Sequence, residues 1–272
     1  MATAPAAGPS HTPARDHMSW TALRTYQACP LRYAFKYVHR LPETTVAASL
    51  LVGVGVHAAL ESHYRALVAG QSASLETLLA AFWGAWQARR TPTILFSKGE
   101  DPGTVDTLVR RLLRAFQHSA LARPRGKIVA IEEQLRGQIL NGLPDLVARL
   151  DLVVDDGDAL TLTDFKTSRA AWTADQVWQA ADQLLLYSAL VKSWAPWARG
   201  RPLRLQFAVL TKTRIPSLTV HPVPCRQPQI ERSRRPAESV CRAIDGGHFY
   251  PNPSPWQCPA CPFRQACSQW QG

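Results

Sequence analysis

The sequence predicts an α/β fold in which a small mixed sheet is flanked by helices. Apolar side chains recur at helical spacing over 46–125, and from Lys127 onward they alternate with polar ones, as they do in strands. A further helical segment then separates this region from another strand-like run at 203–212. Strands and helices that follow one another along a chain are typical of a sheet covered by helices. The 272 residues suffice to bury a core without disulfide bonds.

The first half of the chain is expected to be helical. Residues 18–45 form an aromatic and basic segment whose apolar side chains follow helical spacing until Pro42 interrupts it. Ser and Thr residues that precede apolar helical runs are typical N-caps. The longer helices expected here are one that begins near Gly55, one over 74–90 capped by Ser74, and one over 104–121 capped by Thr104.

The second half is expected to alternate strands with helices. Residues 127–135 predict a strand, and 144–168 predict a hairpin whose turn is the Asp-Asp-Gly-Asp run at 155–158. The remaining elements expected are a helix over 175–194, a strand over 203–212 and a helix over 230–245. The chain then ends in a segment rich in proline, arginine and cysteine.

One folded domain is expected behind a short tail. Residues 1–17 are rich in small and polar side chains and lack the continuous apolar stretch of a secretion signal, so we expect a disordered tail. The longest uncharged apolar stretch, 44–56, has 13 residues, whereas about 20 are needed to span a bilayer. We therefore expect a cytoplasmic protein with no membrane span. The expected parts of the domain 18–272 are a helical region over 46–125, a core over 126–220, and terminal segments over 18–45 and 221–272.

The chain is strongly basic. It has 31 Lys and Arg residues against 20 Asp and Glu, which gives a formal net charge of +11. This balance favours a polyanionic partner, most simply a nucleic acid. Composition alone leaves solvated arginines on helix faces as the alternative. The sequence has no G-x-x-x-x-G-K-[ST] loop, so it carries no nucleotide-driven motor of that kind.

The predicted hairpin brings two carboxylates and an amine together. If 155–158 form the loop, Asp151 faces Leu162, and Asp164 lies diagonally from Asp151 on the same face of the sheet. Lys166 follows on that face, because side chains alternate along a strand. Two carboxylates can hold Mg²⁺ or Mn²⁺, and an ammonium group beside them can stabilise charge on a phosphate. The combination is the one that phosphodiester hydrolysis requires, and the alternative is a surface Asp-Lys pair.

Seven stretches of sequence, taken in order, resemble one enzyme family. They are YQACPLRYAFKYV at 26–38, GVGVHAALE at 53–61, IVAIEEQL at 128–135, ARLDLV at 148–153, TDFKTS at 163–168, QLLLYS at 183–188 and CPACPFRQAC at 258–267. This ordered set resembles the RecB-like PD-(D/E)XK nucleases, which include the RecB and AddB nuclease domains and the adaptation nucleases of CRISPR systems. The resemblance implies a restriction-endonuclease-like core with a helical insertion and iron-sulfur-bearing terminal segments.

The resemblance also implies roles for individual residues. Asp151 and Asp164 would bind the metal, Lys166 would be the catalytic lysine, and His57 would be a further metal ligand from an upstream helix. The residues expected to line the site as catalytic groups on one helix face are Gln183 and Tyr187.

Three details of the motifs qualify these roles. The acid before x-Lys is Asp, whereas Glu is commoner in the wider superfamily, and Ala148 stands where the family often has Gly. Neither departure removes a functional group. Glu132 is a candidate for a further acidic contribution, but beside Glu133 on a strand we expect it to be solvated.

The cysteines are expected to bind a metal centre. In a reducing compartment clustered cysteines more often bind metal than form disulfides, and a tetrahedral site needs four ligands. Three thiols lie within ten residues near the C-terminus, and the resemblance supplies a fourth near the N-terminus and favours a 4Fe-4S cluster over zinc. The cluster ligands expected on this basis are Cys29, Cys258, Cys261 and Cys267. The cluster would join the two terminal segments, and Cys225 and Cys241 are expected to be plain thiols.

Together these expectations describe an Mg²⁺- or Mn²⁺-dependent exodeoxyribonuclease. It would act on DNA ends or single strands in repair, recombination or phage DNA processing, alone or with a separate helicase or recombination partner. The alternatives are a CRISPR-adaptation nuclease that trims spacer precursors, a catalytically inactive iron-sulfur scaffold that binds DNA, and a zinc-stabilised DNA-binding protein.

Overall fold

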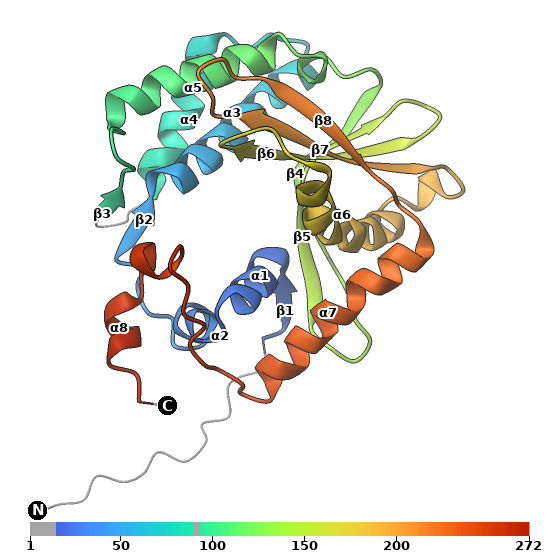
Figure 1. Cartoon of the computed structure of the whole chain (residues 1–272). Helices are drawn as coiled ribbons and strands as arrows, with labels where there is room; N and C mark the ends of the chain where they lie inside the picture. Colours follow the sequence, from blue (N-terminus) through green and yellow to red (C-terminus); the bar gives the residue numbers. More distant parts are fainter. Residues whose placement is uncertain (1–14, 90–92, 272) are drawn as a thin grey trace, which may run out of the picture.

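A mixed six-stranded sheet forms the centre of the computed structural model, which describes residues 15–89 and 93–271 (Figure 1). Its strands are β1 (His17–Ser19), β4 (Lys127–Gly137), β5 (Asp145–Asp155), β6 (Leu160–Ser168), β7 (Leu203–Thr211) and β8 (Leu218–Val223). The β4–β5, β5–β6 and β7–β8 pairs are antiparallel, whereas β1–β5 and β6–β7 are parallel. The predicted fold class, a mixed sheet flanked by helices, is confirmed.

Strand β5 is the most connected strand of the sheet. Strand β4 pairs along one of its edges, whereas β1 pairs with the start of β5 and β6 pairs with its end. The pairing with β1 covers 145–147 and the pairing with β6 covers 152–155. Residues 148–151 therefore have no strand partner from β1 or β6. Asp151, one of the predicted site residues, lies at the point where the pairing of β6 with β5 ends.

Helices cover both faces of the sheet (Figure 1). They are α1 (Trp20–Ala28), α2 (Pro30–Tyr33) continued by a π-helical turn (Ala34–Val38), α3 (Ala48–Val68), α4 (Leu75–Ala88), α5 (Pro102–Gln117), α6 (Ala174–Trp194), α7 (Gln227–Asp245) and α8 (Arg264–Ser268). Helices α3, α4 and α5 share one hydrophobic core with Leu152 and Phe165 of the sheet. Helices α1, α6 and α7 share the other core with Val153 and Leu162. Neighbouring residues of one strand thus serve opposite cores, as their alternation requires.

The predicted elements are recovered with shifted boundaries. Ser74 caps α4 as expected, but α3 begins at Ala48 rather than near Gly55. Thr104 is not the N-cap of α5. The N-cap is Asp101, and Thr104 is the third residue of the helix, whose side chain completes a capping box with Asp101. The strands that the sequence did not predict are β1, β8 and the short parallel pair β2 (Thr45–Ala47) and β3 (Thr93–Leu95).

The expectation that 1–17 form a disordered tail is wrong for residues 15–17, which are ordered. Residues 1–14 lie outside the described residues. Asp16 forms an ion pair with Arg136, and His17 begins a strand that pairs with β5. A three-residue strand with neither apolar alternation nor a turn signal is invisible to sequence patterns. Among the described helices, none combines the length and the apolar character that crossing a bilayer demands.

Close packing of α3 on α4 gives a first testable prediction. A Cβ atom added at Gly55 would lie 2.4 Å from the Phe82 ring, so Gly55→Ala is expected to lower the free energy of unfolding by about 1–3 kcal/mol. Gly84 of α4 has no atom within 4 Å of such a Cβ, so Gly84→Ala is the matched control. Because alanine is the better helix former, the control should gain up to about 1 kcal/mol. Urea unfolding of both variants measures the difference, and equal values would contradict the packing.

Candidate active site

The β5–β6 hairpin places Asp151 and Asp164 differently from the prediction. The last pair before the turn is Asp155 with Leu160, so the loop is 156–159 rather than 155–158. A shift of two residues keeps every side chain on its face but changes its partner. In the observed register Asp151 stands level with Asp164 rather than with Leu162. The strands part there, and the Phe165 amide donates a hydrogen bond to Asp151 Oδ2 at 2.6 Å.

Asp164, Lys166 and Gln183 form a closed ring of contacts. Lys166 Nζ lies 2.7 Å from Asp164 Oδ2 and donates to Gln183 Oε1 at 2.9 Å. Gln183 Nε2 in turn donates to Asp164 Oδ1 at 2.7 Å. Helix α6 thus holds Lys166 and Asp164 in place, because the side-chain amide of Gln183 accepts from the lysine and donates to the carboxylate. Tyr187, one turn further along α6, is also buried, and burial together with the nearby Asp164 raises its pKa, so it is a neutral phenol.

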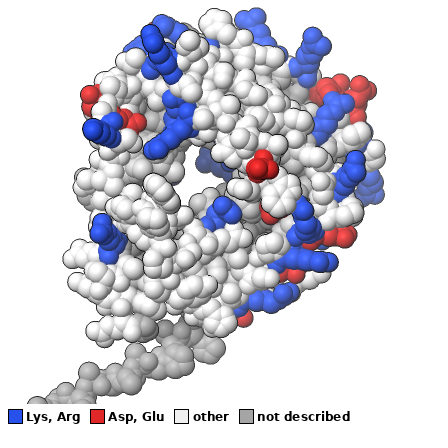
Figure 2. Space-filling view, viewed as in Figure 1, with Lys and Arg blue, Asp and Glu red and all other residues white. Residues whose placement is uncertain are grey.

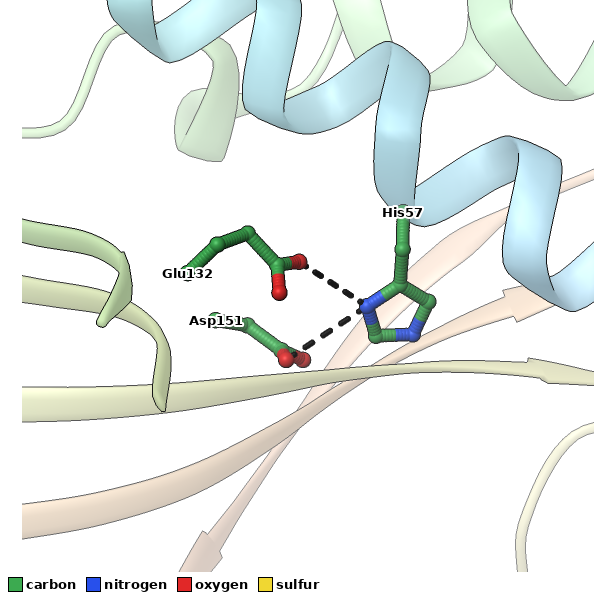
Figure 3. A group of neighbouring side chains, drawn as sticks. All are labelled: His57, Glu132 and Asp151. Carbon is green, nitrogen blue, oxygen red and sulfur yellow. Dashed lines mark hydrogen bonds and ion pairs between the residues drawn. The ribbon is translucent and has the colours of Figure 1, made fainter. Parts of the chain in front are cut away.

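His57, Glu132 and Asp151 form a second group beside this ring (Figure 3). His57 projects from α3 toward the sheet, and its Nδ1 lies 3.4 Å from Asp151 Oδ1 and 3.3 Å from Glu132 Oε1. One ligand atom from each of the three residues lies within 4.8 Å of the others. The expectation that Glu132 is solvated is wrong, because its side chain is only 6% exposed. The sequence gives no signal for this, since Glu132 and Glu133 both lie on the same strand.

The groups in this site change one another's charge. Burial would lower the pKa of His57, but the Asp151 and Glu132 carboxylates outweigh it and raise that pKa well above its ordinary value. Burial raises the pKa of Asp164 to about 6 against the pull of Lys166, and Asp151 adds to the rise. The pKa of Lys166 is raised despite burial, by Asp164 and Asp151. The Asp151 and Glu132 carboxylates therefore favour the charged form of His57 in the metal-free protein.

This donor set fits a divalent cation. Carboxylate oxygens are the ligands of Mg²⁺ and Mn²⁺, and an imidazole is a good ligand for a transition metal once it is neutral. Both oxygens of Asp164 already contact Lys166 and Gln183. Of the three predicted metal ligands, His57 and Asp151 therefore converge with Glu132, whereas Asp164 belongs to the lysine ring.

The charge on His57 gives a prediction for the metal-free protein. A histidine whose folded pKa is raised adds stability that is complete below its ordinary value near 6.5 and is lost as pH rises through the folded pKa. His57→Gln is therefore expected to cost about 2 kcal/mol more at pH 6 than at pH 9. Urea unfolding in a chelator measures both values. The same loss at both pH values would show that His57 is neutral in the metal-free protein.

An open groove leads to the lysine ring between α1 and α6. It has a volume of about 460 Å³, and Lys166 and Gln183 form its inner wall. Trp20 and Arg24 of α1 and Trp172 before α6 form its outer part. Figure 2 shows the middle of this view hollowed, with Lys and Arg side chains at the rim. A polyanion in this groove would therefore meet Lys166 beside basic and aromatic side chains.

The four predicted cluster cysteines line a separate pocket of about 270 Å³. They are Cys29, Cys258, Cys261 and Cys267, all free thiols. The pocket wall is apolar, with Leu31, Phe35 and Phe263 packed together beside the thiols. The backbone amides of Asn252 and Ser254 point at two of the sulfurs, at 3.4 and 3.2 Å.

The two other cysteines lie outside this pocket. Cys241 lies on α7 and is buried in the core, and burial raises its pKa to about 11. Cys225 packs at the edge of the same core.

The fold and the site define a class of protein: a mixed sheet that presents an Asp-x-Lys motif beside a second aspartate is the arrangement of a PD-(D/E)XK nuclease. A family model described as the PD-(D/E)XK nuclease superfamily matches residues 17–268, and the chain belongs to this superfamily.

Comparisons with other proteins add to this. The crystal structure of a provisionally named exonuclease from Eubacterium rectale matches with a TM-score of 0.60 and 13% identity, over 94% of this chain and 89% of that one, which shows a shared fold. The structure of SSO0001 matches with a TM-score of 0.38 and 16% identity, over 92% of this chain and 95% of that one. No curated protein gives a significant match.

Proposed function

We propose that this nuclease is a divalent-metal-dependent exodeoxyribonuclease of the RecB-like branch, acting on DNA ends or single strands. The observation that supports it best is the closed ring of Asp164, Lys166 and Gln183 beside Asp151 and His57. The +11 charge and the open groove at Lys166 suit a nucleic-acid strand. The name of the Eubacterium rectale protein agrees with an exonuclease.

Each residue of the site has a role in this proposal. A divalent cation held by Asp151 and His57 would supply Lewis-acid activation of the phosphodiester and of the attacking water. Lys166 stabilises the charge that develops on the phosphate, because its ammonium group is held in place and Lys166 lines the groove. Gln183 holds Lys166 and Asp164 in place through its two hydrogen bonds. Tyr187 is buried one turn further along α6 and lines the site on that side. Asp164 keeps Lys166 charged, and in this proposal it would also contribute to cation binding beside Asp151.

We also propose that the cysteine pocket holds a 4Fe-4S cluster, which joins the segments 18–45 and 221–272 of one domain, 18–272. Arg32 lines the pocket, and its buried Nε has no acceptor among the described residues. A four-thiolate centre is anionic and would satisfy it.

The biological setting is proposed more broadly. Free thiols in all six cysteines suit a reducing compartment such as the cytoplasm. There the enzyme would process DNA in repair, recombination or phage replication, alone or with a separate helicase or recombination partner.

The proposal is tested with end-labelled linear DNA, single-stranded and double-stranded, and with circular DNA as a control. The expected result is release of short products from linear DNA with Mg²⁺ or Mn²⁺, none with EDTA, and little cleavage of circles. Cleavage of circular DNA at the same rate would replace the exonuclease by an endonuclease. Binding without cleavage at any metal concentration would support the inactive scaffold.

A further inference from the structure

Glu132 has a backbone conformation that an L-amino acid rarely adopts. Its φ is +50°, and among the described residues the only other non-glycine with positive φ is Arg40. Such a conformation costs free energy and persists only where the surroundings impose it, and it is concentrated at functional sites. Glu132 lies in the middle of β4, where neither a turn nor a chain reversal explains it.

The irregularity at Glu132 turns its side chain into the site. In the β4–β5 register Glu132 stands level with Asp151, between the pairs Ile131–Leu152 and Glu133–Leu150. Leu150 packs in the core of α1, α6 and α7, whereas Leu152 packs in the core of α3, α4 and α5. The side-chain alternation of the two strands is therefore interrupted at this level. Both carboxylates face His57 as a result (Figure 3).

Arg149 fixes the orientation of the Glu132 carboxylate. Its Nε contacts Glu132 Oε2 at 2.5 Å from the solvent side, and one of its terminal nitrogens lies 3.9 Å from Glu61 on α3. The Arg149 side chain is 61% exposed, whereas that of Glu132 is 6% exposed. One oxygen of Glu132 is thus held from outside, and the other, Oε1, is left facing His57 Nδ1.

We propose that Glu132 is a third protein ligand of the divalent cation, with His57 and Asp151, and that Arg149 is its positioning residue. The inference rests on the proposed function for the presence of the cation, and it adds a carboxylate that the Asp-x-Lys motif does not contain. A surface ion pair with Arg149 needs neither a left-handed backbone nor a buried carboxylate, whereas here the left-handed backbone directs a buried carboxylate toward His57 and Asp151, as a shared cation requires. Groups that orient a ligand typically change metal affinity by about 10- to 100-fold.

Metal affinity is the readout that tests this proposal. Mn²⁺ binding to the whole protein without DNA is measured by titration with electron paramagnetic resonance. Glu132→Gln is expected to weaken binding at least about 10-fold. Arg149→Gln should weaken it about 10-fold, but should add little in the Glu132→Gln background, because both changes act on one contact. Glu133→Gln is the matched control, since Glu133 is the exposed neighbour on the same strand, and should bind like wild type.

A second variant guards against loss of the fold. Glycine adopts φ near +50° without strain, so Glu132→Gly removes the carboxylate while it suits the backbone. It is expected to unfold at or above the wild-type temperature and yet bind Mn²⁺ at least about 10-fold more weakly. Wild-type Mn²⁺ affinity in a folded Glu132→Gly or Glu132→Gln protein would overturn the inference, and wild-type affinity in Arg149→Gln would remove the positioning role. If these affinities fall as expected but DNA is not cut, the proposed function fails while the ligand assignment stands.

Discussion

Lys166→Ala is expected to slow DNA cleavage about 10³-fold, which corresponds to about 4 kcal/mol of lost transition-state stabilisation. The ammonium group is held by Asp164 and Gln183 and is aimed into the groove, so no other described side chain can take its place without rebuilding that ring. The measurement is product release from end-labelled linear DNA at saturating Mg²⁺ or Mn²⁺. Binding of the same DNA in EDTA, measured by fluorescence anisotropy, should change by less than about threefold, because one phosphate contact among several is lost.

The matched control for this prediction is Lys192→Ala. Lys192 lies on α6 as Gln183 does, but it is exposed and far along the helix. Its removal takes away the same charge without touching the ring, so its cleavage rate should stay within about twofold of wild type. Lys166→Arg keeps the charge and should recover little activity, because a guanidinium does not fit where an ammonium contacts both Asp164 and Gln183. Wild-type cleavage by Lys166→Ala would remove the lysine from the mechanism.

The sequence could predict that Asp164 and Lys166 share one face of the hairpin, but not the register or the direction in which Asp151 points. Parity along a strand depends only on residue number, so Asp164 and Lys166 can be placed on one face, where both contact Gln183 of α6. Asp151 faces His57 of α3 instead, because the side-chain alternation of β5 is interrupted between Leu150 and Leu152. The register depends on the loop, and any of several four-residue loops fits an Asp-Asp-Gly-Asp run. The structure selects 156–159, where the Asp156 carboxylate accepts from the amides of Asp158 and Ala159. Hydrogen bonds of that kind compete within a fraction of a kcal/mol and cannot be ranked from composition.

The role of α6 was more predictable than that of β4. Gln183 and Tyr187 are one helical turn apart, so any helix there presents both to the same side, and the capping box of Thr173 and Gln176 fixes where it begins. The direction of the Glu132 side chain depends instead on a positive φ in a non-glycine residue, which no residue propensity predicts. The spatial meeting of Cys29 with the C-terminal cysteines is also beyond local patterns, since Cys258 lies 229 positions after Cys29. Only the resemblance to a family suggested it.

Cys258→Ser is expected to remove both the metal centre and much of the stability of the protein. A cluster that links Cys29 to Cys258 closes a loop of 229 residues, and on the chain-entropy model for cross-links such a closure stabilises by roughly 5 kcal/mol. For a protein of this size a loss of that order lowers Tm by about 10–20 °C. The wild-type protein purified without oxygen should be brown with iron and sulfide bound, whereas the variant should be colourless.

A control must show that the lower Tm of Cys258→Ser comes from loss of the metal centre rather than from removal of any thiol. Cys225→Ser makes the same chemical change outside the pocket, so it should keep the colour and the Tm within a few degrees of wild type. The thiols and the apolar wall of Leu31, Phe35 and Phe263 bring the two ends of the chain together, and the Leu31 amide already donates to the Tyr250 carbonyl there. The ends therefore retain contacts without a metal, so the loss of Tm in Cys258→Ser measures what the cluster adds to these contacts. A colourless wild type with one bound zinc would replace the cluster by a zinc site, whereas an unchanged Tm in Cys258→Ser would show that the two ends are held by these side chains alone.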